Sequence, residues 1–329
     1  FAAIFYERDQ IGAGVVYDVS FLERFLIAGR VVWTYAWLLV WPHPLVFFYP
    51  DWTVDASAWW QYLFPVSAIA LVLTLVLLSR RIGRGPAAAV LMFGGTLVPA
   101  MGFVAVFPMT FSFVADHFQY LASIGFITLV VGTIAYHVQR GPEAARAAAV
   151  GLFAAVLLLL AFLTWEQSKV YQNQKTLWRH TIEHNPRSAV AHLNLDLELI
   201  NAANNPRLEA SKRAELLAEA VALYERAIEL YPDDTKARNN LAQLYLRQGD
   251  LTTARRYIDA ALEAGRAQGM EYAVGYNTLG VILMRQDRLD EAAAAFEAAI
   301  EHRAGPYAEA HNNLAQVQTL RGEIDAAIE

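Results

Sequence analysis

Four long runs without a charged residue limit the folds open to this chain. Each run meets the roughly 18 to 20 apolar residues that a helix needs to cross the hydrocarbon core of a bilayer. Backbone groups inside lipid must be paired within their own segment, so such runs fold as helices. The runs are residues 56–79, 86–115, 118–136 and 147–165. They predict a membrane domain over residues 1–165, with spans at about 59–79, 86–107, 118–138 and 147–165.

A shorter apolar segment precedes these runs. Between Arg30 and Pro42 only about eleven apolar residues are available, which is too few for a span. Trp33, Trp37 and Trp41 recur every four residues and therefore share one helix face, as in the aromatic belt at a membrane surface. We predict an interfacial or re-entrant helix over residues 21–41.

Arginine placement predicts the orientation of the spans. Three arginines follow the first predicted span and two more lie between the third and the fourth. Basic residues of short loops stay on the cytoplasmic side. By parity, residues 41–52, residues 116–117 and everything after residue 165 lie on the opposite side, which is the periplasm of a bacterium or the lumen of a eukaryote. The five arginines are Arg80, Arg81, Arg84, Arg140 and Arg146.

Composition divides the chain into two halves. Hydrophobic residues make up 56% of the chain, which is too apolar for an ordinary soluble domain and too polar for a membrane bundle alone. Acidic and basic residues balance up to residue 165, so the net charge of −6 lies in the second half. The sequence shows no basic stripe, which argues against a nucleic-acid partner. The absence of cysteine excludes disulfides and thiolate metal sites.

From residue 189 onward the chain repeats itself. The segment "ARNNLAQLYLRQGDLTTARRYIDAAL" (237–262) aligns with "GYNTLGVILMRQDRLDEAAAAFEAAI" (275–300), and a further copy starts at residue 310. The pattern resembles the tetratricopeptide repeat, a helix pair in which small residues let two helices approach closely. An earlier copy carries Asp196 at the small position and an insertion around residues 201–213. We predict a linker helix over residues 166–188 and repeats over residues 189–329.

The stretch "FSFVADHFQYLASIG" (111–125) places Asp116 and His117 between two predicted spans. Ionisable residues near membrane depth are kept mainly where they face a polar cavity or a partner. A solvated external loop is the alternative, and the residues alone leave both interpretations open.

Two motifs resemble a known family. "FVADHFQYLASIG" (113–125) and "FLERFLIAGRVVWTYAWLLVWPHPLVFFYPDW" (21–52) are similar to the transmembrane and tetratricopeptide repeat-containing O-mannosyltransferases. The resemblance implies a GT-C membrane fold and transfer of mannose from a dolichyl-phosphate carrier to Ser or Thr. Asp116 and His117 stand where that family has an acidic residue and an arginine, and Tyr120 is retained. Since His is charged only when its pKa is raised, a constant positive charge on a lipid phosphate is in doubt here.

The resemblance also implies catalytic acidic residues in a first external loop. We expect this chain to begin after that loop, so we assign no catalytic residue, and a divalent cation is expected only in a longer protein. Transfer from an isoprenoid phosphate needs cations near the phosphate and an apolar groove for the tail. The candidates beside Asp116, His117 and Tyr120 are Arg24 and Arg30.

Asparagines recur at neighbouring positions of the first helix of each repeat. Amide side chains can bond an extended peptide backbone without reading its sequence, and the pattern resembles the asparagine ladder of the nucleocytoplasmic O-GlcNAc transferase. Repeat consensus alone explains the pattern equally well. The predicted peptide groove consists of Asn194, Asn239, Asn240, Asn277, Asn312 and Asn313.

The segment "HTIEH" (180–184) matches a pattern of zinc proteases, but no third ligand is evident, so we predict solvated histidines and no metal site. The sequence thus predicts an all-α protein with a partial GT-C-like bundle followed by a tetratricopeptide solenoid. As a hypothesis, it transfers a sugar from a polyprenyl-phosphate carrier to a protein or envelope acceptor that the repeats recruit. The alternative is a membrane-anchored scaffold without catalytic activity. The predicted location is a bacterial inner membrane with periplasmic repeats.

Overall fold

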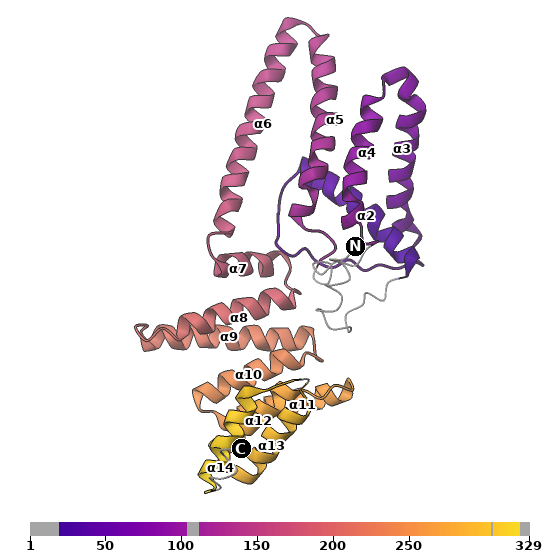
Figure 1. Ribbon diagram of the computed structural model, residues 1–329. Coiled ribbons are helices and arrows are strands. Elements are labelled where there is room, and N and C mark those ends of the chain that lie inside the picture. The colour runs from indigo at the N-terminus through magenta and orange to yellow at the C-terminus, as the bar shows by residue number, and fades with distance from the viewer. Residues whose placement is uncertain (1–19, 104–111, 304, 323–329) are drawn as a thin grey trace. The chain divides into compact units, whose positions relative to one another are not determined.

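A computed structural model describes residues 20–103, 112–303 and 305–322, and these residues form helices joined by loops (Figure 1). No β-strand occurs among the described residues, so the predicted all-α class is confirmed. The chain divides into two compact units, residues 1–188 and residues 189–329. Each unit has its own arrangement of helices.

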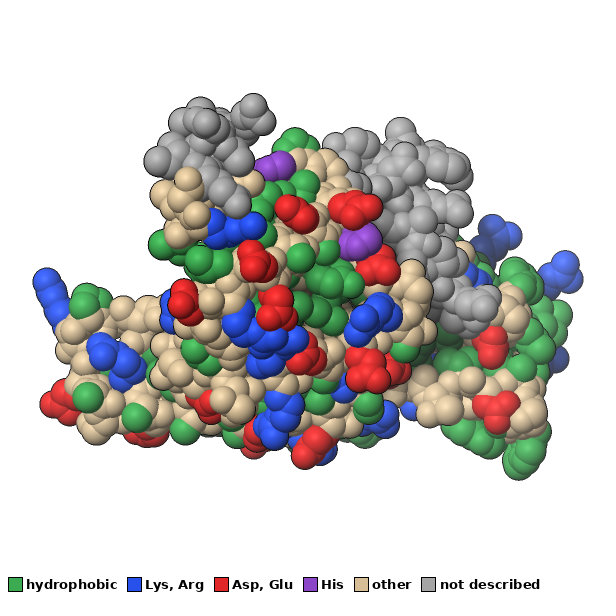
Figure 2. Space-filling model, turned by 90° about the horizontal axis from the view of Figure 1, so that it is seen from below, with side chains coloured by type: hydrophobic (Ala, Val, Ile, Leu, Met, Phe, Trp, Pro, Cys, Tyr) green, Lys and Arg blue, Asp and Glu red, His purple; other side chains and the backbone are tan. Residues whose placement is uncertain are grey.

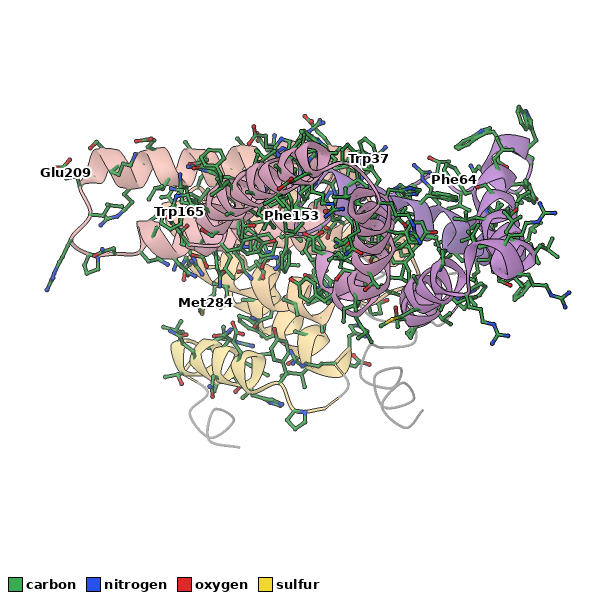
Figure 3. All side chains as sticks on the ribbon, turned by 90° about the horizontal axis from the view of Figure 1, so that it is seen from above. Trp37, Phe64, Phe153, Trp165, Glu209 and Met284 are labelled. Atoms are coloured by element: carbon green, nitrogen blue, oxygen red, sulfur yellow. The ribbon has the colours of Figure 1, made fainter. Side chains whose placement is uncertain are left out.

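Three helices of the first unit are long and apolar enough to cross a membrane, judged by length and composition over the described residues. Each begins with a short 3-10 turn or a charged first turn. Hardly any of their residues are buried inside the protein, as Leu77 and Leu158 show with 79% and 73% exposure. Figure 3 shows Phe153 and Trp165 on the helix over Glu143–Val170. Such a surface suits lipid rather than water. The helices are α3 (Leu63–Ile82, preceded by η1, Trp59–Tyr62), α5 (Tyr120–Gln139, preceded by η4, Asp116–Gln119) and α6 (Glu143–Val170).

The second predicted span is shorter than expected. Helix α4 runs over Gly85–Leu97 and continues as the 3-10 turn η2 over Val98–Ala100. Pro99 explains the end of the regular helix, because proline has no N–H to donate and its ring clashes with the preceding turn. The predicted end at residue 107 was therefore too far along the chain, and residues 104–107 lie outside the described residues.

Helix α2 (Phe21–Val40) is the most buried helix of the first unit. Its N-terminus has a capping box, in which Ser20 and Glu23 satisfy each other's backbone N–H groups. Val31 and Tyr35 are fully buried and belong to one core with Leu97 of α4. In Figure 1, α2 lies across the lower ends of α4 and α5. The helix predicted as interfacial or re-entrant is thus central to the packing of this unit.

The three tryptophans predicted for one face of this helix differ in exposure. Trp33 donates from Nε1 to the backbone oxygen of Phe64 over 3.0 Å, which ties α2 to α3. Trp37 and Trp41 are 61% and 50% exposed. Two of the three rings therefore point away from the protein, as an interfacial belt requires.

The second unit consists of antiparallel helix pairs that stack on one another (Figure 1). The turn between the first two helices contains Glu209, labelled in Figure 3. The predicted insertion around residues 201–213 lengthens these two helices and the turn between them. The helices are α8 (Ala189–Ala203), α9 (Ala210–Leu230), α10 (Thr235–Gln248), α11 (Leu251–Ala267), α12 (Ala273–Arg285), α13 (Leu289–Glu301) and α14 (Ala308–Leu320).

Small residues set the distance within each pair, as the repeat pattern predicts. A Cβ on Gly280 of α12 would lie 2.5 Å from the ring of Phe296 of α13. Ala242 of α10 is fully buried at the matching position. Asp196 holds this position in α8, and it too is fully buried. The predicted tetratricopeptide solenoid is confirmed, with one carboxyl group in its core.

Candidate functional site

Asp116 and His117 begin the short helix η4, which leads into α5. The residues before them are held by Tyr35 of α2. The Tyr35 hydroxyl donates to the backbone oxygen of Ala115 over 3.1 Å and accepts from the backbone N–H of Ala115 over 3.0 Å. Because Tyr35 is fully buried in the core, it fixes the position at which the chain enters η4.

The carboxylate of Asp116 meets a tyrosine from the loop after α2. The Tyr49 hydroxyl donates to Oδ1 of Asp116 over 2.6 Å. Burial raises the pKa of the Tyr49 phenol, and the nearby charge of Asp116 raises it further. Tyr49 therefore stays protonated and acts as a hydrogen-bond donor at neutral pH.

Asp116 and His117 lie in the wall of a cavity of about 390 Å³. This volume lies within the range of small-molecule sites, about 300–1,000 Å³. The wall combines a few polar groups with aromatic rings from three segments of the first unit. The polar side chains are Ser112, Asp116, His117, Tyr120 and Tyr171, and the apolar ones include Val46, Phe47 and Phe48.

The aromatic side of the cavity is held by helix α7 (Gln174–His184) of the same unit. Trp178 packs edge-on against Phe47 at 5.5 Å between ring centroids and stacks on Phe48 at 6.1 Å. Asn185 donates from Nδ2 to the backbone oxygen of Phe48 over 3.2 Å, and Gln167 of α6 donates to that of Leu45 over 3.0 Å. The loop over residues 41–52 is therefore held by hydrogen bonds from Asn185 and from α6.

The two arginines predicted beside this site lie elsewhere. Arg24 donates from Nη1 to the backbone oxygen of Gly102 over 3.0 Å. The guanidinium of Arg30 lies 4.4 Å from the ring centroid of Trp52 and 6.0 Å from that of Phe64. Neither side chain lines the cavity that holds Asp116. The structure brings Asp116, His117 and Tyr120 together in the wall of one cavity.

A second cavity of about 480 Å³ lies among α2, α3, α4 and α5, and its walls are almost entirely apolar. Gly94 of α4 opens onto this space, because nothing lies within 4 Å of where its Cβ would stand, whereas Gly29 of α2 lies close against Pro65. Trp33 and Phe126 contribute aromatic walls. This groove was not predicted from the sequence, in which the adjacent glycines of "FGGT" are the available signal.

The histidines of "HTIEH" pack against each other on α7. The rings of His180 and His184 lie 4.3 Å apart between centroids, and the backbone oxygen of His180 lies 2.9 Å from Nδ1 of His184. Within the described residues, no group of three His, Cys, Asp or Glu side chains is placed to hold a metal ion.

The asparagines of the repeats bond mainly within the solenoid. Asn239 and Asn277 are only 2% and 4% exposed. Asn277 donates to Glu309 over 3.1 Å and accepts from Asn313 over 3.0 Å, which links α12 to α14. Asn194 donates to the backbone oxygen of Val190, Asn240 bonds Tyr224, and Asn312 is exposed. Their use in a peptide groove stays a prediction.

Charged side chains of both signs are interspersed on the face of the protein shown in Figure 2.

Models of the tetratricopeptide repeat family match residues 223–256 and residues 277–329. The second unit carries tetratricopeptide repeats. This agrees with its helix pairs and with the small residues at their crossings. Repeats of this family suggest a role in binding proteins or peptides.

The chain as a whole is similar to protein O-mannosyl-transferases. Protein O-mannosyl-transferase TMTC1 of Mus musculus is 25% identical over 243 residues, which cover 68% of this chain and 23% of the relative. Protein O-mannosyl-transferase Tmtc3 of Drosophila melanogaster is 24% identical over 311 residues, 88% of this chain and 32% of the relative. The resemblance that the sequence motifs indicated is thereby confirmed. The chain spans 23% and 32% of the length of these two relatives.

Among solved structures, a crystal structure of MamA is 16% identical, with a TM-score of 0.37, over 47% of this chain and 80% of MamA. The crystal structure of YrrB, a repeat protein with an unusual peptide-binding site, is 22% identical, with a TM-score of 0.35, over 46% of this chain and 69% of YrrB.

Proposed function

We propose that the whole protein is a membrane glycosyltransferase of the GT-C type, which transfers a sugar from a polyprenyl-phosphate carrier to a protein or envelope acceptor recruited by the repeats. One observation carries the proposal. The similarity to a protein O-mannosyl-transferase extends over 88% of this chain and includes both units. A shared repeat alone would have matched only the second unit.

The geometry of the first unit supports this proposal. The apolar groove among α2, α3, α4 and α5 suits an isoprenoid tail, because its walls offer almost no polar group. The smaller cavity with Asp116 lies at the end of α5 that is remote from Arg140. With Arg140 on the cytoplasmic side, this cavity opens to the periplasm of a bacterium or the lumen of a eukaryote.

A divalent cation prefers several oxygen ligands from carboxylates, carbonyls or water. The described residues do not fit a resident metal ion, because they hold no cluster of three metal-ligating side chains. No step of the proposed transfer is therefore assigned to a metal.

A membrane-anchored scaffold is the second candidate, favoured by the repeats themselves. Their family models match independently of the membrane helices. In that case the repeats gather envelope proteins, and substitutions in the cavity of the first unit leave the function intact.

Transfer can be measured with the protein encoded by the whole gene, reconstituted in lipid nanodiscs. The assay follows a radiolabelled sugar from polyprenyl phosphate to a Ser- and Thr-rich protein acceptor. We expect transfer by the unaltered protein and its loss on His117→Ala, with Asp55→Asn as a control at an exposed aspartate. A properly folded protein that binds acceptor through its repeats but transfers no sugar would establish the scaffold instead.

A further inference from the structure

We propose that the cavity lined by Asp116, His117 and Tyr120 binds a neutral glycosyl group, and that it is a sugar subsite rather than a phosphate subsite. The inference rests on the proposed function, since it names the part of the substrate that this cavity takes. Three observations carry it: the charge of the wall, the aromatic rings in it, and the rigidity of its frame.

The charge of the wall disfavours an anion. Asp116 supplies a carboxylate, His117 is the basic side chain described in the wall, and no Lys or Arg is described there. Arg24 and Arg30, the cations predicted for the phosphate, contact Gly102 and the Trp52 ring instead. A phosphate in this cavity would face a like charge without a neighbouring guanidinium or ammonium. A ligand that donates hydrogen bonds to a carboxylate fits better.

The carboxylate of Asp116 has acceptor capacity left for such a ligand. An ionised carboxylate offers about four lone-pair sites on two oxygens, and the Tyr49 hydroxyl bonds Oδ1. Burial keeps the pKa of Tyr49 high, so the phenol holds one oxygen and orients the other. Hydroxyl groups of a sugar are donors of the kind that this second oxygen accepts.

The aromatic wall suits the apolar face of a sugar ring. Phe47, Phe48, Tyr120 and Tyr171 border the same cavity. A pyranose has hydroxyl groups around its edge and C–H groups on its faces, and the latter pack on aromatic rings. Tyr120 and Tyr171 also add hydroxyl groups, and these residues are 70% and 48% exposed. The combination of one fixed carboxylate with rings and phenols gives both stacking and hydrogen bonding.

The frame of the cavity is fixed before any ligand enters. Tyr35 holds Ala115, the residue before Asp116, through two hydrogen bonds. Trp178 packs against Phe47 and Phe48 of the wall. A preorganised cavity loses less entropy when it binds a small ligand, so a single sugar residue can be held in a defined orientation.

Ligand binding is tested by saturation-transfer difference NMR on this chain in lipid nanodiscs, because glycoside detergents would compete for the site. The probes are methyl α-mannoside, inorganic phosphate and tetramethylammonium. We expect saturation transfer to the mannoside, and competition by neither ion. Binding of tetramethylammonium without binding of the mannoside would show that the cavity is an aromatic cage for cations. Binding of phosphate without binding of the mannoside would show a phosphate subsite. Either result overturns the proposal, as does the absence of any signal.

Two variants locate the bound sugar. Asp116→Asn weakens mannoside binding by about tenfold, because a charge-assisted hydrogen bond is lost. Tyr120→Ala removes a largely exposed ring that the fold does not need, and it weakens binding in the same direction. The matched control is Asp55→Asn, at an aspartate that bonds Ser57 and lies outside the cavity. Unchanged affinity in both cavity variants overturns the proposal.

Failure of this inference and failure of the proposed function give different results. A protein that transfers sugar while Asp116→Asn and Tyr120→Ala leave both transfer and mannoside binding unchanged is a glycosyltransferase with its sugar subsite elsewhere. A protein that binds the mannoside through Asp116 but transfers no sugar has the subsite without the proposed activity.

Discussion

The hydroxyl of Tyr49 lies 2.6 Å from Oδ1 of Asp116, and this bond joins two segments that are 67 residues apart in the sequence. It fixes the loop after α2 to the start of α5. The bond orients the Asp116 carboxylate. It also holds the loop over residues 41–52 in place.

Removing this bond should loosen the loop. We expect Tyr49→Phe to lower the free energy of unfolding of this region by about 1.5 kcal/mol, the usual contribution of a hydrogen bond to a charged group. Hydrogen exchange of peptides from residues 41–56 should become faster in nanodiscs. Tyr136→Phe is the control, since its ring is exposed at the far end of α5. Equal protection in Tyr49→Phe and the unaltered protein would show that the bond does not hold the loop.

The crossing of α2 and α3 depends on a glycine. A Cβ at position 29 would lie 2.4 Å from the backbone nitrogen of Pro65. Gly29→Ala should therefore lower the free energy of unfolding by roughly 1–3 kcal/mol, although alanine favours a helix more than glycine does. Thermal unfolding in detergent measures the change. Gly151→Ala in α6 should be neutral or slightly stabilising, because nothing lies within 4 Å of its added Cβ. A harmless Gly29→Ala would mean that the two helices can move apart.

Much of this fold can be predicted from the sequence, because span length and helix pairing depend on residues that are close together in the chain. Bilayer thickness fixes the length of a span, which is how α3, α5 and α6 were predicted. The helix pairs follow from small residues at fixed spacing, as Ala242 and Gly280 show. The second span was predicted too long, because composition alone does not show where Pro99 ends a regular helix.

The cavity was predicted only in part. The Asp116, His117 and Tyr120 group is contiguous in the sequence and could be seen as a motif. Tyr35, Tyr49 and Trp178 contact residues of the cavity wall from distant segments, and no periodicity encodes such contacts. Arg24 and Arg30 were grouped with the site because they are cations of the same predicted face. Their contacts with Gly102 and Trp52 are visible only in three dimensions.

Asp196 makes the first repeat sensitive to pH. Burial, and secondarily the charge of Glu219, raises its pKa to about 9 from a usual value of 3.8. In the unfolded chain the carboxyl group loses its proton above pH 3.8, whereas the folded chain keeps it up to about pH 9. The stability of the repeat should therefore fall as the pH rises through this range.

Replacing Asp196 with alanine tests this pH dependence, because Ala242 holds the same position in the next repeat. Both carboxylate oxygens are buried without a hydrogen-bond partner. Asp196→Ala should raise the free energy of unfolding at pH 7 by about 1–3 kcal/mol and have little effect at pH 4. Hydrogen exchange of peptides from α8 and α9 reports the change at each pH. Asp233→Ala, at an exposed side chain, should show no such trend. A gain that is equal at both pH values would assign the effect to packing alone.

The predicted orientation can be tested directly, because the chain has no cysteine of its own. Ser57→Cys lies in the loop before α3, and Ala144→Cys lies in the first turn of α6, near Arg140 and Arg146. A membrane-impermeant maleimide should label Ser57→Cys in intact cells and Ala144→Cys only after permeabilisation. The reverse pattern would place the cavity on the cytoplasmic side and contradict the orientation inferred from the arginines.

The asparagines of the repeats offer two roles that substitution can separate. Asn277 is buried and bonds both Glu309 and Asn313, so Asn277→Ala should cost about 1–3 kcal/mol of stability by leaving buried partners unpaired. Asn312 is exposed on the same helix, α14, that carries Asn313, and Asn312→Ala should leave thermal unfolding unchanged. A peptide groove requires that Asn312→Ala weaken capture of an extended peptide at constant stability, measured by fluorescence anisotropy. Suppose that Asn312→Ala leaves peptide capture unchanged while Asn277→Ala destabilises the unit. The asparagines then serve to pair neighbouring helices of the repeats, and peptides are bound on another face.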